Sequence, residues 1–137
     1  LIVKMVEWED KFSVGVLKID EEHKKLIDIM NNVIAAKQRN DDHGVIRKIL
    51  DEMVDYANIH FKTEETYMLK FKYPEYSYHK EEHLDFTFKT LAYQSRVLSG
   101  DLAVATEILE YLQLWLFEHI QRTDKKYTEC FNTNGIK

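Results

Sequence analysis

Six histidines occur in this chain of 137 residues, several of them close to carboxylates, and such a set can bind metal. The segment from position 79 is HKEEH, which places His79 and His83 four residues apart. On a helix, residues four apart are neighbours on one face, so two imidazoles at this spacing can bind one ion. Surface histidines also fall at this spacing by chance. The pair alone leaves a solvated helix face and a metal site open, and the rest of the chain must decide.

The composition fits one globular domain. Hydrophobic residues make up 45% of the chain, which is enough for a core at this length. The formal net charge of -5 offers no basic stripe to neutralise phosphates, so we expect no nucleic-acid partner. Cys130 is the one cysteine, so we expect no internal disulfide and a reducing, cytoplasmic location. No run of about 18 apolar residues occurs, so we predict no membrane span.

Four long helices are predicted after an N-terminal arm. The chain contains one proline and four glycines, and this scarcity of helix breakers favours long helices. The arm, 1–19, has no helical period. We predict Asp20 as the N-cap of the first helix and Ser77 as that of the third. The expected fold is all-α, a single domain over 1–137 that forms an up-down-up-down four-helix bundle. The expected helices are about 20–38, 45–71, 77–98 and 102–130.

Each predicted helix carries a histidine on its apolar stripe, on a wheel of about 100° per residue. One histidine in such a place is usually a core histidine with one satisfied hydrogen bond. Here all four helices show the pattern, and an antiparallel bundle brings these positions to one end. Imidazoles clustered with carboxylates in a dry core would be costly, and a cation removes that cost. The predicted ligands are His23, His60, Glu64, His79, His83, His119 and Asp124.

The number of ligands indicates two metal ions. Seven ligands exceed what one tetrahedral zinc takes, whereas they suit two ions with carboxylate bridges in a bundle core. Imidazole suits iron, copper and zinc, and the lack of thiolate argues against a soft metal. Asp124 follows His119 by five residues, about 140° round an α-helix, so we expect both to flank one inward face. Five histidines, two bridging carboxylates and a bridging oxide or hydroxide would leave one vacancy, on the ion with fewer histidines.

Four segments together resemble the hemerythrin family, most closely its bacterial members. They are IDEEH at 19–23, HFKTEE at 60–65, HKEEH at 79–83 and WLFEHIQRTDKKY at 115–127. The arm VEWEDKFSVGV and the YP at 73–74 are also similar, so the likeness covers nearly the whole chain. It implies a non-haem di-iron site with an oxo or hydroxo bridge. It also implies these ligands: His79, His83 and His119 on one iron, His23 and His60 on the other, and Glu64 and Asp124 as bridges.

The resemblance implies reversible dioxygen binding, for carriage, storage or delivery, and not an enzyme. A sensor domain is one alternative, but it would normally be attached to a signalling module, and none is visible in this sequence. An enzyme that consumes oxygen, peroxide or nitric oxide is another, and it would need a reductant route. No flavin or haem motif indicates one. The expected ligand is dioxygen, and the sequence indicates no protein partner.

The vacancy places the predicted oxygen pocket between the first, second and fourth helices. Leu116 and Ile120 fall between the directions of the two ligands on the fourth helix, and Phe61 lies about 100° round from His60. We predict that Phe61, Leu116 and Ile120 wall this pocket, and plain core packing is the alternative.

Three further side chains have weaker predictions. Tyr67 and Tyr127 are expected near the site, either as hydrogen-bond donors to its carboxylates or as packing only. His43, beside Gly44 in a polar break, is expected to be solvated and not a ligand.

Overall fold

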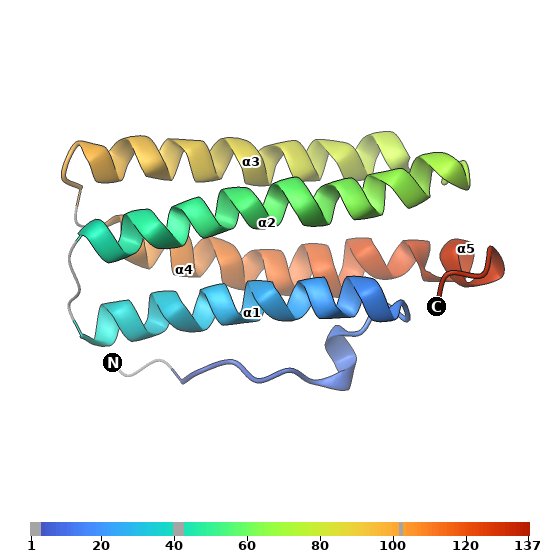
Figure 1. Ribbon diagram of the computed structural model, residues 1–137, viewed down its shortest axis with the longest axis horizontal. Coiled ribbons are helices and arrows are strands. Elements are labelled where there is room, and N and C mark those ends of the chain that lie inside the picture. Colours follow the sequence, from blue (N-terminus) through green and yellow to red (C-terminus); the bar gives the residue numbers. More distant parts are fainter. Residues whose placement is uncertain (1–3, 40–42, 102) are drawn as a thin grey trace.

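In a computed structural model of the chain, four long helices run antiparallel to their neighbours (Figure 1). The structure describes residues 4–39, 43–101 and 103–137, and every regular element in these ranges is a helix. Helix α1 packs against α2 and α4, and α2 packs against α3, so the predicted up-down-up-down bundle is confirmed. The four helices are α1 (Leu17–Gln38), α2 (His43–Lys70), α3 (Tyr76–Leu98) and α4 (Val104–Leu114).

The predicted fourth helix is not one regular α-helix. Beyond α4 the chain continues as a π-helical segment, η2 (Trp115–Thr123), in which backbone hydrogen bonds span five residues. A 3-10 segment, η3 (Asp124–Tyr127), and the short helix α5 (Thr128–Thr133) follow. The helix predicted over about 102–130 is therefore helical but not α-helical between 115 and 127, and residue 102 lies outside the described ranges.

Two predicted helix starts also differ from the structure. Helix α1 begins at Leu17, so Asp20 lies in its first turn and is not the N-cap. The Asp20 carboxylate instead accepts hydrogen bonds from Ser13 Oγ at 2.5 Å and Val14 N–H at 2.9 Å. Helix α3 begins after Glu75, so Ser77 is not its N-cap either. His43 is the first residue of α2 and not part of a loop, and its side chain lies outside the described part of the structure.

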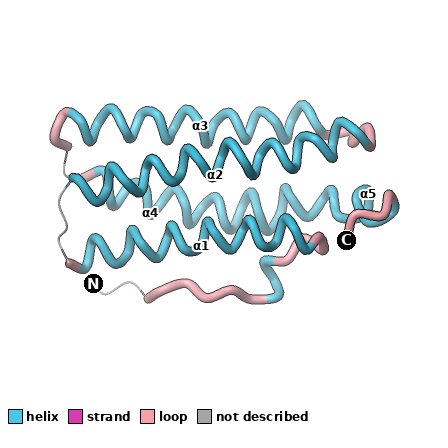
Figure 2. Tube along the Cα trace, viewed as in Figure 1, coloured by secondary structure: helices cyan, strands magenta, loops and turns pink. Residues whose placement is uncertain are grey.

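The described part of the arm is mostly extended and lies along α1 (Figures 1 and 2). One short 3-10 turn, η1 (Asp10–Phe12), interrupts it, and Phe12 enters the core. At Gly15 the backbone takes φ 73°, and a Cβ there would lie 2.9 Å from Cγ2 of Thr128. Glycine therefore permits the arm to turn into α1 while touching α5. Thr128 Oγ1 holds this junction by donating to the Val14 carbonyl at 2.6 Å.

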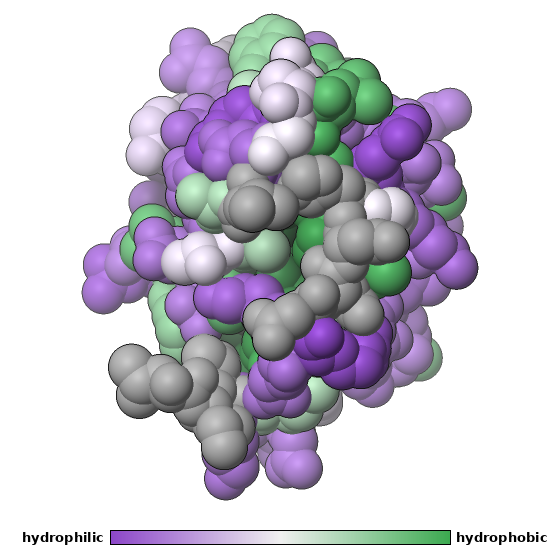
Figure 3. Space-filling view, turned by 90° about the vertical axis from the view of Figure 1, so that its left-hand side faces the viewer, coloured by the Kyte–Doolittle hydropathy of each residue, from purple (hydrophilic) through white to green (hydrophobic). Residues whose placement is uncertain are grey.

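Two apolar clusters fill the bundle on either side of the histidines. The larger runs through the middle of all four helices and includes Leu26, Met53 and Ile108. The smaller joins the arm to α5 and includes Val14, Met68 and Phe131. The end formed by the α1–α2 and α3–α4 connections is mostly hydrophilic, with hydrophobic side chains visible between the helix ends (Figure 3). Within the described ranges, no helix is long and apolar enough to cross a membrane.

Candidate metal centre

All seven predicted ligands meet in the interior at one end of the bundle. They come from the beginning of α1, the second half of α2, the beginning of α3 and the junction of η2 with η3. No side chain among them is more than 2% exposed, and these side chains are His23, His60, Glu64, His79, His83, His119 and Asp124. Antiparallel packing explains the convergence, because the start of an odd helix lies beside the end of an even one.

The ligand atoms form two groups that share both carboxylates. Within each group every atom lies within 4.8 Å of the others. The first group consists of Glu64, His79, His83, His119 and Asp124. The second consists of His23, His60, Glu64 and Asp124. Three histidines therefore face one position and two face the other, with a pair of carboxylates between them.

Each carboxylate reaches histidines of both groups. Asp124 Oδ1 lies 2.9 Å from His79 Nε2 and 3.0 Å from His119 Nε2, whereas Asp124 Oδ2 lies 3.2 Å from His23 Nε2. Glu64 Oε1 lies 3.0 Å from His83 Nε2 and 3.3 Å from His60 Nε2. Glu64 and Asp124 are thus placed as two ligands that could bridge a pair of ions.

The π-helical segment explains how Asp124 joins the cluster. The Asp124 backbone N–H donates to the His119 carbonyl, a hydrogen bond that spans five residues. This bond places residue 124 one wide turn beyond residue 119, so both side chains point to the centre. In a regular α-helix they would lie about 140° apart. The sequence showed the five-residue spacing, and the backbone geometry that makes the spacing work was not predicted.

Several polar atoms of the cluster lack a hydrogen-bond partner, which fits a bound cation. Among the described residues, the buried Nε2 atoms of His79, His83 and His119 and both Asp124 oxygens lie close to other polar atoms of the cluster, but none of them makes a hydrogen bond of normal geometry. His23 Nε2 and His60 Nε2 lie only 3.0 Å apart. Unpaired nitrogens and oxygens in a dry core cost several kcal/mol each, of order 2–7 without compensation. Metal ligation satisfies them, because it uses the same lone pairs.

The electrostatics of the cluster also favour positive charge. Burial alone lowers the pKa of His60, but the charge of Glu64 and the hydrogen bond to Glu22 outweigh it and raise that pKa to about 10. For His79, burial is likewise outweighed by Asp124 and Glu64, which raise its pKa to about 10. Burial raises the pKa of Glu64, but the histidines around it hold that pKa well below its ordinary value. The site therefore attracts cations, and a divalent metal supplies the charge that protons would otherwise bring.

Comparison with known proteins agrees with this arrangement. The family profile described as "Hemerythrin HHE cation binding domain" matches residues 14–130. The chain belongs to the hemerythrin family. A bacteriohemerythrin from Pseudomonas aeruginosa is 33% identical over 123 residues, 90% of this chain and 79% of the relative. One from Clostridium acetobutylicum is 32% identical over 129 residues, 91% of this chain and all of the relative. A solved structure of wild-type hemerythrin is 30% identical with a TM-score of 0.82, covering 93% of this chain and 98% of the other.

Three glutamates support the histidines of this hemerythrin from outside. Glu22 accepts from His60 Nδ1, Glu65 from His83 Nδ1 and Glu82 from His119 Nδ1, each at 2.8 Å. A proton on Nδ1 leaves the Nε2 lone pair free to face the centre. Each glutamate is next in sequence to a predicted ligand of its own helix, and it accepts from a histidine on the following helix. Each helix thus orients a histidine of the next one. Sequence reasoning missed this role, although the paired acids in IDEEH, HFKTEE and HKEEH were a visible signal.

The two tyrosines predicted near the site have different positions. The Tyr127 hydroxyl donates to Glu64, and its ring stacks on His79 with a centroid separation of 5.6 Å. Tyr67 instead packs against Phe71 and Phe131 in the smaller apolar cluster. Tyr127 is therefore the tyrosine that can hold a bridging carboxylate in place.

The three predicted pocket residues are all buried. Leu116 and Ile120 lie on η2, with 1% and 0% exposure, and Leu116 lines a groove between the arm, α1 and η2. The Phe61 ring stacks on His83 at 3.9 Å and lies 5.8 Å from the ring of His60, so it contacts a histidine of each group.

Proposed function

We propose that this hemerythrin binds dioxygen reversibly at a non-haem di-iron centre with an oxo or hydroxo bridge. The observation that carries the proposal is the pair of overlapping ligand groups with both carboxylates in common. Under this proposal Glu64 and Asp124 bridge the irons. The other ligands are His79, His83 and His119 on one iron, and His23 and His60 on the other.

The protein's own residues would prepare this centre for a small ligand. The five imidazoles are neutral ligands, and their nitrogens suit iron. Iron bound here would supply a reducing centre at which dioxygen can bind and from which it can leave. Glu22, Glu65 and Glu82 fix three of the rings, and Tyr127 donates to Glu64. These contacts restrict movement of the ligands when the charge of the centre changes.

We place the dioxygen position on the side of His23 and His60, because the protein offers one histidine fewer there. Leu116 and Ile120, together with Phe61, would form its apolar wall. Such a wall excludes water and acids, and both promote irreversible loss of bound oxygen.

Carriage, storage or delivery of dioxygen is the role that we favour over catalysis. A sensor would use the same binding chemistry, and an enzyme would consume oxygen, peroxide or nitric oxide. The test is anaerobic loading with iron, followed by repeated oxygenation and removal of oxygen while the optical spectrum is recorded. Reversible cycling is expected. Steady oxygen consumption would support an enzyme, and failure to bind iron would overturn the proposal.

A further inference from the structure

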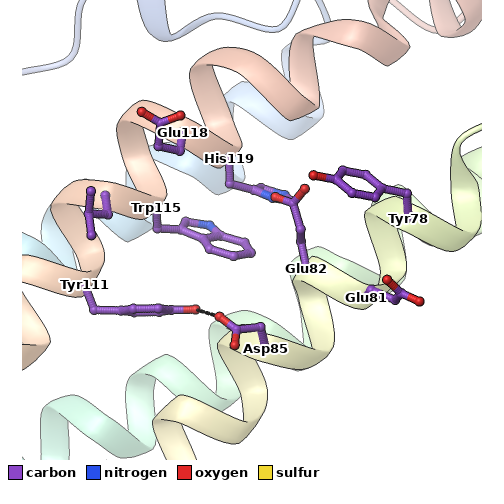
Figure 4. A pocket seen from close by; sticks show the side chains of 9 residues that line it. Tyr78, Glu81, Glu82, Asp85, Tyr111, Trp115, Glu118 and His119 are labelled. Atoms are coloured by element: carbon purple, nitrogen blue, oxygen red, sulfur yellow. Dashed lines mark hydrogen bonds and ion pairs between the residues drawn. The ribbon is translucent and has the colours of Figure 1, made fainter.

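A surface pocket between α3 and the α4–η2 helix reaches the proposed ligand His119 from outside (Figure 4). Its volume is about 310 Å³, and His119 forms part of its lining. Aromatic rings and carboxylates make up most of the remaining wall, and the described lining residues include no lysine or arginine. The rings are Tyr78, Tyr111 and Trp115, and the carboxylates are Glu81, Glu82, Asp85 and Glu118.

Three rings at four-residue intervals connect this pocket to the proposed ligand His119. Trp115 stacks on His119 with centroids 3.8 Å apart and planes at 12°. Tyr111 stacks on Trp115 at 6.3 Å and 29°. Trp115 is buried, whereas Tyr111 is half-buried and faces α3 across the pocket (Figure 4). Apart from the sulfur-containing side chains, tryptophan and tyrosine are the side chains most easily oxidised by one electron. Tyr111 and Trp115 can therefore pass electrons one at a time toward His119.

Tyr111 also has a partner for its proton. A phenol that loses an electron becomes strongly acidic and must release its proton. The Tyr111 hydroxyl donates to Asp85 Oδ2 at 2.8 Å, and Asp85 is exposed to water. Tyr56, which stacks on His60 at 5.0 Å, has a buried hydroxyl without a hydrogen-bond partner among the described residues. Its oxidation is disfavoured because its proton has no acceptor.

A competing series runs from the centre to the connection between α2 and α3. Tyr127 stacks on His79, Tyr73 lies edge-on to Tyr127 at 6.5 Å, and Tyr73 donates to Glu75 at 3.2 Å. The ring contacts and the hydrogen bond are longer than in the Tyr111 series. Tyr73 therefore provides a matched control for any experiment on Tyr111.

The charge of the pocket selects the molecule that could deliver electrons. Glu118 pairs with Arg122 at 3.4 Å, but both side chains are exposed and the pair is screened by water, so Glu118 still adds negative charge. The other three carboxylates extend along one side of α3 toward the rings. Aromatic rings bordered by carboxylates attract a cation through its charge and through cation–π contact. A pocket of this volume suits a small aromatic molecule.

We propose that Trp115 and Tyr111 conduct single electrons from a cationic aromatic donor in this pocket to the metal centre, where hydrogen peroxide is the oxidant. The inference rests on the proposed iron centre. Trp115 gives one electron to the centre, and Tyr111 then gives one electron to Trp115 and its proton to Asp85. The donor, a cationic phenol, returns a hydrogen atom to Tyr111, and Asp85 releases its proton for water formation. Two such turns convert one peroxide and two phenols to two phenoxyl radicals and two waters.

The first test detects the radical itself. Hydrogen peroxide is mixed with the oxidised iron protein without donor, frozen, and examined by electron paramagnetic resonance. We expect a tyrosyl radical that Tyr111→Phe removes and Tyr73→Phe leaves unchanged, at equal iron content; in Tyr111→Phe the unpaired electron is expected on Trp115 instead. Asp85→Asn keeps the ring and removes the proton acceptor, so it is expected to weaken the tyrosyl signal. A tyrosyl radical that survives Tyr111→Phe, or one that disappears in Tyr73→Phe, would overturn the route.

The second test measures recognition of charge with a matched pair of phenols. One carries a para trimethylammonium group and the other a para sulfonate. For the cationic phenol at low salt, Glu81→Gln with Glu118→Gln is expected to raise KM about tenfold and to leave kcat unchanged. Glu52→Gln with Asp55→Asn makes the same change of charge at the α1–α2 groove and is the control. If both double variants change the KM for the cationic phenol equally, the donor does not bind in this pocket.

Failure of this inference can be distinguished from failure of the proposed function. A protein that binds iron and cycles with oxygen, yet gives no radical and oxidises no phenol, retains the proposed function and lacks this route. A protein that binds no iron has neither.

Discussion

At the scale of single residues, three of the histidine rings are held by carboxylates that do not themselves face the metal position. Glu22 shows the arrangement fully, because one oxygen accepts from His60 Nδ1 at 2.8 Å and the other from Thr63 Oγ1 at 3.0 Å. The glutamate is thereby fixed on both sides. A histidine held in this way loses little freedom when it binds a metal, so the outer carboxylate contributes to affinity without contact with the ion.

Glu22→Gln is therefore expected to weaken iron binding by about 10- to 100-fold while the protein remains folded. The amide keeps the size of the side chain but loses the charge that favours a proton on Nδ1. Competition against a chelator measures the affinity. Glu21→Gln is the control, because Glu21 is adjacent and exposed, and it pairs with Lys24 on the surface. Equal iron affinities of the two variants would show that the outer carboxylate does not matter.

A second prediction at this scale concerns the apolar wall. Ile120→Glu or Leu116→Asn is expected to keep both irons but to speed autoxidation of the oxygenated protein about tenfold, equivalent to ~1.4 kcal/mol in the barrier. The added polar group admits water or a proton beside bound oxygen. Stopped-flow decay of the oxygenated form measures the rate. Ile108→Asn places a polar group in an equally buried position farther along the bundle. The control is expected to lower stability and leave the autoxidation rate unchanged. If the Leu116 and Ile120 variants behave in the same way, these two residues only pack the core.

At the scale of elements, the bundle and the positions of its ligands follow largely from the sequence. His23, His60, His79 and His119 lie on apolar stripes, and helical periodicity together with antiparallel packing brings them together. Local irregularities were not predictable in the same way. Asp20 has the chemistry of an N-cap but binds the arm instead, a contact between segments that no helical period reveals. The π-helical segment likewise depends on tertiary packing around the centre.

Exchanging the residues at positions 123 and 124 tests this segment. In an α-helix, residue 123 would share a face with His119, because the two are four residues apart. In the π-helical segment residue 124 takes that place. The double variant Thr123→Asp with Asp124→Thr is therefore expected to bind no more iron than Asp124→Thr alone. Iron analysis of the purified proteins decides. Parent-like iron content in the exchanged variant would mean that the segment adopts α-helical geometry when metal binds.

At the scale of the whole molecule, the metal centre joins all four helices at one end of the bundle. The ligands of each proposed ion come from more than two helices, so bound metal links segments that are distant in sequence. Without metal, the same position holds buried carboxylates and imidazoles with unpaired polar atoms. Iron binding is thus coupled to folding. Removal of iron is expected to lower the melting temperature by about 10 °C or more, as for a ligand near 1,000 times its Kd.

The overlap of the two ligand groups makes a sharper prediction about stoichiometry. The parent protein is expected to bind two irons per chain. His60 belongs to the second group alone, so His60→Ala is expected to lose that iron first and to retain up to one. Glu64 belongs to both groups, so Glu64→Ala is expected to lose more iron and to melt at a lower temperature than His60→Ala.

His43→Ala removes a histidine at the first residue of α2, near the opposite end of the bundle, and is the control. Metal analysis and thermal melts of the four proteins measure these effects together. Parent-like iron content in both His60→Ala and Glu64→Ala would show that the ligands are assigned wrongly. One iron in the parent, or preference for zinc, would exclude the di-iron centre and leave a site for a single cation.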